Sequence, residues 1–114
     1  MGILSFRVND LLLIDLVFDD NAESKFRPTL FIETNNNNVE IYKIMSQYKT
    51  KSDFMKSKYF EIVDFEDAGL YKLSWIDTFK KYRVGVSKFN IRRIGTLSKE
   101  DIKRFAEFLE EQNE

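Results

Sequence analysis

Short apolar runs of strand length, separated by polar stretches, constrain the fold of this 114-residue chain more than any other feature. Residues 11–18 and 27–34 are rich in Leu, Ile, Val and Phe, and residues 39–44 alternate between apolar and polar. Runs of this length and composition are typical of β-strands. Four asparagines at 35–38 predict a turn, because Asn tolerates left-handed backbone. The second and third strands should therefore form a hairpin.

The second half of the chain continues this pattern of short apolar runs. Further apolar runs predict four more strands, at residues 59–65, 73–79, 83–86 and 88–94. The stretch 46–58 is polar and basic, and we expect a long loop there that contains one helical turn.

The C-terminal segment has the signature of an amphipathic helix. Ser98 is placed as its N-cap, and Asp101 stands three residues later, as in a variant capping box. One apolar face follows at helical spacing, formed by Ile102, Phe105, Ala106 and Leu109. Together the segments predict a single mainly β (α+β) domain, residues 1–114, with a C-terminal helix that packs on the strands.

Composition excludes several kinds of chemistry. The chain has no cysteine and no histidine, which removes the disulfide framework, the thiol nucleophile and the commonest metal ligand. We therefore expect no cofactor and no metal site. No apolar run is long enough to span a membrane and no signal peptide is recognisable, so we expect a cytoplasmic protein without a membrane partner.

The net charge of −1 hides an uneven distribution. Residues 10–23 carry five acids and no base, whereas residues 42–60 carry five lysines against one acid. Residues 80–93 add six bases and no acid. Clustered bases on a nearly neutral protein can form a local footprint for nucleic acid. The alternative is that they are solvated loop residues.

The only proline of the chain lies at the start of the second predicted strand, directly after an arginine. Pro28 biases Arg27 towards an extended backbone, so we expect Arg27 at the mouth of the loop, facing a phosphate. A guanidinium binds phosphate through a planar fork and keeps its charge. The alternative for Arg27 is an ion pair with Asp19 or Asp20.

Two segments of the chain resemble one family of toxins. The first is Phe18-Asp19-Asp20-x-x-x-Ser24-Lys25-x-Arg27-Pro28-x-Leu30. A second match follows in the same order, at residues 69–77 and 93–98. The combination is similar to the MazF/PemK family of toxin ribonucleases and spans nearly the whole chain, with the middle the least similar.

The resemblance implies a fold and a function. The fold would be a small SH3-like β-barrel of the MazF/PemK/CcdB toxin type with a C-terminal α-helix, usually paired as a homodimer. The function would be a sequence-specific, metal-independent endoribonuclease that cleaves single-stranded RNA, the toxin of a type II toxin–antitoxin system neutralised by a cognate antitoxin.

The resemblance also assigns roles within the motif. Arg27 matches the main catalytic residue of the family, and Ser24 and Lys25 match its phosphate-contacting loop. The chain departs from the family after the third strand, where members carry a Thr or Ser that assists the arginine. Met45 stands at that position here, so Ser46 is the candidate to supply the hydroxyl.

The basic loop supplies further candidates for RNA binding. Lys49 and Lys51 would contact phosphates, and Tyr48 and Phe54 would stack on unpaired bases. For Trp75, inside a predicted strand, core packing is favoured over stacking on RNA.

Two other functions remain open at this stage. A catalytically weak or silent barrel could act as an RNA- or antitoxin-binding module, and position 45 discriminates that alternative from the nuclease. A relation to the gyrase-poisoning toxins is weaker, because the Lys-x-Arg-Pro loop favours RNA.

Overall fold

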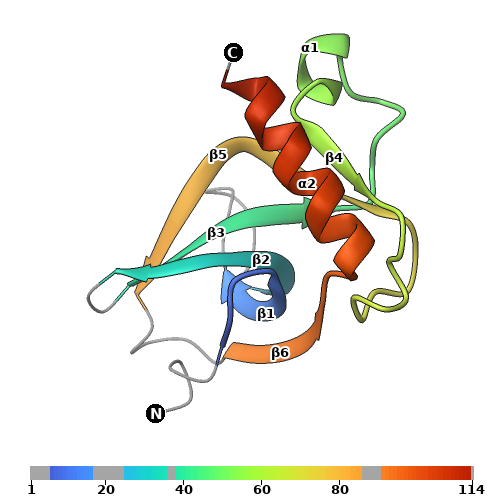
Figure 1. Ribbon diagram of the computed structural model, residues 1–114. Coiled ribbons are helices and arrows are strands. Elements are labelled where there is room, and N and C mark those ends of the chain that lie inside the picture. Colours follow the sequence, from blue (N-terminus) through green and yellow to red (C-terminus); the bar gives the residue numbers. More distant parts are fainter. Residues whose placement is uncertain (1–5, 17–24, 36–37, 86–90, 114) are drawn as a thin grey trace.

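The computed structural model describes residues 6–16, 25–35, 38–85 and 91–113 (Figure 1). It contains β1 (Asp10–Leu16), β2 (Lys25–Asn35), β3 (Asn38–Met45), α1 (Asp53–Lys56), β4 (Tyr59–Ile62), β5 (Ser74–Gly85), β6 (Ile91–Thr96) and α2 (Lys99–Gln112). In these ranges the strands form a six-stranded antiparallel sheet in the order β4-β5-β3-β2-β1-β6. No pairing there joins β4 to β6, so the sheet is open.

The mainly β architecture with a C-terminal helix confirms the prediction from the apolar runs. The asparagine hairpin is confirmed as well, because Asn35 pairs with Asn38 between β2 and β3. The basic stretch after β3 contains the single helical turn α1. Neither helix in the described ranges is long and apolar enough to cross a membrane.

One predicted break between strands is wrong. The sequence suggested separate strands at 73–79 and 83–86, but β5 runs without interruption from Ser74 to Gly85. Its pairing with β3 passes from Lys43↔Asp77 to Ile41↔Tyr82, so β5 carries extra residues between the two registers. Residues 78–81 form this bulge, and the chain stays extended through it.

Three strand ends also differ from expectation. β4 stops at Ile62, three residues before the predicted end. β6 ends at Thr96, two residues beyond the predicted end, and predicted residues 88–90 lie outside the described ranges. β2 begins at Lys25, so Arg27 is the third residue of a paired strand, opposite Ile14 of β1, and not at the mouth of a loop.

The helix α2 lies across the β4 end of the sheet and buries one aromatic face there (Figure 1). Phe105 is buried, with its ring centroid 5.1 Å from that of Phe60 and 6.2 Å from that of Tyr42. The predicted apolar face is right for Phe105 but wrong for Ala106, which is exposed. Phe108 packs in its place, because the helix rotates its 102–105–108–109 stripe towards the sheet.

A buried carboxylate fixes the start of α2. The N-cap prediction is confirmed, since Ser98 Oγ accepts a hydrogen bond from the backbone N–H of Asp101 at 3.0 Å. The Asp101 side chain is 0% exposed and accepts from the backbone N–H groups of Val63 and Asp64, at 3.2 and 2.8 Å. Arg104 also donates to it, at 2.5 Å. Asp101 therefore ties the helix to the chain that follows β4.

Replacing Asp101 should destabilise the fold. In Asp101→Ala the two N–H groups and the Arg104 guanidinium lose their acceptor, so we expect the free energy of unfolding to fall by about 1–3 kcal/mol. Urea denaturation followed by circular dichroism measures this change. Glu107→Ala, an exposed acid on the same helix, is the matched control and should leave the midpoint unchanged.

Candidate functional site

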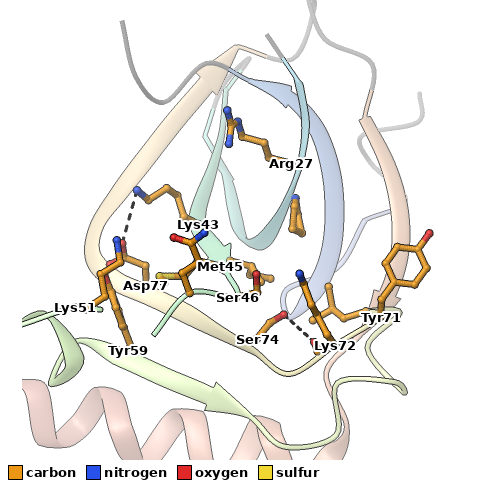
Figure 2. A pocket seen from close by; sticks show the side chains of 14 residues that line it. Arg27, Lys43, Met45, Ser46, Lys51, Tyr59, Tyr71, Lys72, Ser74 and Asp77 are labelled. Carbon is orange, nitrogen blue, oxygen red and sulfur yellow. Dashed lines mark hydrogen bonds and ion pairs between the residues drawn. The ribbon is translucent and has the colours of Figure 1, made fainter. Parts of the chain in front are cut away.

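A cavity of about 560 Å³ lies where β2, β3 and β5 meet the segment before β5. Figure 2 shows side chains entering it from all of these elements. Four cationic side chains line it, namely Arg27, Lys43, Lys51 and Lys72. Asp77 is the carboxylate among its described lining residues. The excess of positive charge suits an anionic ligand such as a phosphodiester.

Strand pairing positions Arg27 in this cavity. Pairing of β2 with β3 begins only at Thr29, opposite Lys43, so the missing N–H of Pro28 removes no bond to β3. Thr29 is buried, and its hydroxyl donates to the carbonyl of Leu12 at 2.9 Å. Arg27 therefore extends from a backbone anchored on β1.

The end of β3 brings both candidate positions for the assisting hydroxyl to the same cavity. Had the strand continued, Met45 and Ser46 would have faced opposite sides of the sheet. Instead β3 ends at Met45, the chain bends at Ser46, and both residues line the cavity (Figure 2). The Ser46 hydroxyl thus shares a cavity with Arg27.

Lys43 and Asp77 form an ion pair that sequence reasoning missed. Their charged atoms are 3.8 Å apart, and the Asp77 side chain is almost entirely buried. Asp77 also accepts a hydrogen bond from the backbone N–H of Phe79 at 2.9 Å. These residues are distant in the sequence and meet only because β3 pairs with β5, so no local pattern could have identified them.

Tyr59 pairs with Asp77 across β4 and β5 and also lines the cavity. Burial, and second the negative charge of Asp77, raise the pKa of Tyr59 above its ordinary value of 10.0. Its phenol is therefore neutral at physiological pH and available as a hydrogen-bond donor.

The segment before β5 is held by a close backbone approach. Gly69 has a φ of 87°, and a Cβ there would lie 2.1 Å from the carbonyl oxygen of Ile94. Only glycine fits, which explains this residue in the second family-like segment. Beyond it Ser74 Oγ donates to the carbonyl of Lys72 at 2.9 Å, and Tyr71 is fully exposed. The segment thereby holds Lys72 at the cavity.

The other predicted RNA-binding residues are dispersed. Ser24 lies outside the described ranges. Lys25 and Lys49 are exposed and are not among the cavity residues. Tyr48 stacks on the half-buried Trp75 with ring centroids 4.7 Å apart. The Lys56 ammonium is 5.0 Å from the centroid of the Tyr48 ring.

Tyr48 therefore has protein neighbours where a base would stack. Phe54, in contrast, is exposed on α1. Among the predicted residues, the cavity brings together Arg27, Ser46 and Lys51. In the described ranges no group of three or more His, Cys, Asp or Glu side chains is arranged to hold a metal ion.

The titration of Tyr59 tests this geometry without any ligand. In Asp77→Asn the pKa of Tyr59 should fall but stay above its ordinary value, because burial remains. NMR of ¹³C-labelled tyrosine as a function of pH measures it, and Glu61→Gln, an exposed carboxylate of β4, should change nothing. Because the pKa of Tyr59 is raised in the folded state, the neutral phenol favours folding. Its contribution to the free energy of unfolding is fully present below the ordinary tyrosine pKa and is lost as the pH rises through the folded-state pKa.

No protein-family model matches the chain, and no curated protein matches it significantly.

Proposed function

We propose that this protein is a metal-independent endoribonuclease that cleaves single-stranded RNA, as the resemblance to the MazF/PemK toxins implies. The observation that carries the proposal is the convergence of Arg27 and Ser46 on one cation-rich cavity. Arg27 reaches it from β2 and Ser46 from the bend after β3, and Lys43, Lys51 and Lys72 also line it. A site of this kind suits a phosphodiester held by several donors.

The proposed reaction is attack of the ribose 2′-hydroxyl on the adjacent phosphorus, with departure of the 5′-oxygen. Arg27 stabilises the charge that develops on the phosphate oxygens, and the Ser46 hydroxyl donates to the same group. Asp77, the lining carboxylate, is the candidate to accept the 2′ proton. The neutral phenol of Tyr59 is the candidate to give a proton to the departing 5′-oxygen, which leaves as a 5′-hydroxyl.

The wider biological setting belongs to the same proposal. The open antiparallel sheet with its C-terminal helix is compatible with an SH3-like barrel. Exposed apolar side chains such as Phe26 and Leu73 are available to a homodimer or to a cognate antitoxin. We propose the protein as the toxin of a type II toxin–antitoxin pair.

Removal of Arg27 should abolish RNA cleavage while preserving the fold. Loss of a charged donor aimed at a transition-state oxyanion lowers a rate by about a hundredfold to a thousandfold. We expect this loss for Arg27→Ala in a gel assay with labelled RNA. Arg27→Lys should restore little, because an ammonium does not reproduce the two-pronged contact. The urea midpoint of each variant serves as the folding control.

Ser46 and Met45 offer the complementary comparison. Ser46→Ala should lower the rate, and Met45→Thr should raise it by adding a second hydroxyl to the cavity. If Arg27→Ala cleaves at the parental rate in a preparation free of contaminating nuclease, the catalytic assignment fails. A non-catalytic module that binds RNA or an antitoxin would then take its place.

A further inference from the structure

Two phenylalanines, one on α1 and one on β5, form an exposed aromatic pair. Phe54 of α1 is 60% exposed and Phe79 of β5 is 54% exposed. Their ring centroids are 6.1 Å apart with an interplanar angle of 83°, an edge-to-face arrangement. A single exposed apolar side chain is ordinary on a protein surface, but two in mutual contact form a patch available to a ligand.

Local structure holds both rings in place. The Ser52 hydroxyl caps α1 by accepting from the backbone N–H of Met55 at 3.2 Å. On the other side the backbone N–H and the hydroxyl of Thr78 both donate to the carbonyl of Lys58, at 2.9 and 2.6 Å. This contact ties the β5 bulge, which carries Phe79, to the segment directly after α1.

One lysine lies over the pair, and two more follow it in the chain. The Lys58 ammonium is 5.8 Å from the centroid of the Phe54 ring and also donates to the Gln112 side chain at 3.0 Å. Lys80 and Lys81 follow Phe79 directly in the bulge, and both are exposed, with the Lys80 ammonium 5.1 Å from the centroid of the Tyr82 ring. An aromatic surface bordered by ammonium groups matches a single strand of nucleic acid, whose bases stack while its phosphates contact the cations. An apolar protein partner would gain nothing from these lysines.

The pair is linked to the cavity through neighbouring residues of the same segments. Asp77 lines the cavity, and its carboxylate accepts a hydrogen bond from the backbone N–H of Phe79. Lys51, which also lines the cavity, precedes α1 by two residues. Both rings therefore belong to segments that also supply cavity residues.

We infer that Phe54 and Phe79 form a stacking subsite for unpaired nucleotides that flank the phosphate in the cavity. The inference rests on the proposed function, since it requires single-stranded RNA as the ligand. Stacking on phenyl rings accepts any base, so the subsite contributes affinity and orientation and little sequence discrimination.

The test measures binding separately from cleavage. The probe is a short fluorescein-labelled 2′-O-methyl oligoribonucleotide of randomised sequence, which lacks the attacking hydroxyl, and a matched chain without bases is the second probe. Fluorescence anisotropy at several salt concentrations gives the affinity and its salt dependence. The variants are Phe54→Ala, Phe79→Ala, Phe79→Leu and Phe79→Trp. Val63→Ala, which truncates an apolar side chain that is 50% exposed, is the control.

Each alanine variant should weaken binding of the base-containing probe by about fivefold or more. Binding of the abasic probe and the salt slope should not change, because no phosphate contact is lost. Phe79→Trp should retain affinity, and Phe79→Leu should behave like the alanine variant, because leucine is apolar but cannot stack. Val63→Ala should match the parent.

Three results would overturn the inference. Parental affinity in both alanine variants, with RNA cleavage by the parent intact, would reject the subsite and leave the proposed function standing. A lower molar mass in light scattering of these variants, with unchanged RNA affinity, would show that the pair is a protein interface. Failure of the parent to bind either probe would reject the inference together with the proposed function.

Discussion

The pairing of β3 with β5 is the interaction on which the rest of the structure depends. It sets Lys43 opposite Asp77, which creates the ion pair inside the cavity. Its register shift produces the bulge that carries Phe79. β4 attaches to the sheet through β5, and α2 covers the β4 end. A slip of one residue in this pairing would turn the cavity side chains to the other face of the sheet.

The absence of histidine constrains the chemistry as strongly as the pairing constrains the shape. Among its described lining residues, the cavity instead offers a guanidinium, ammonium groups, two serine hydroxyls, two tyrosine phenols and one carboxylate. Such groups supply positioning and charge stabilisation, the main requirements of phosphodiester cleavage by an internal hydroxyl. In the proposed complex the Phe54–Phe79 pair would stack on bases while the cavity holds the phosphate.

Local signals in the sequence predicted the local structure well. The hairpin between β2 and β3, the helical turn in the basic loop and the Ser98 cap depend on neighbours within a few residues, and all are confirmed. Features set by pairing across the sheet were harder to predict. The continuity of β5, the strand position of Arg27 and the Lys43–Asp77 pair all require the register of distant strands.

The ends of the cleaved RNA test the central claim most directly. A labelled single-stranded RNA is incubated with the purified protein in excess EDTA, and the products are identified by mass spectrometry. Attack by the 2′-hydroxyl without a metal predicts fragments that end in a 2′,3′-cyclic phosphate and begin with a 5′-hydroxyl. Fragments with a 3′-hydroxyl and a 5′-phosphate, or cleavage that appears only when magnesium is supplied, would contradict the account.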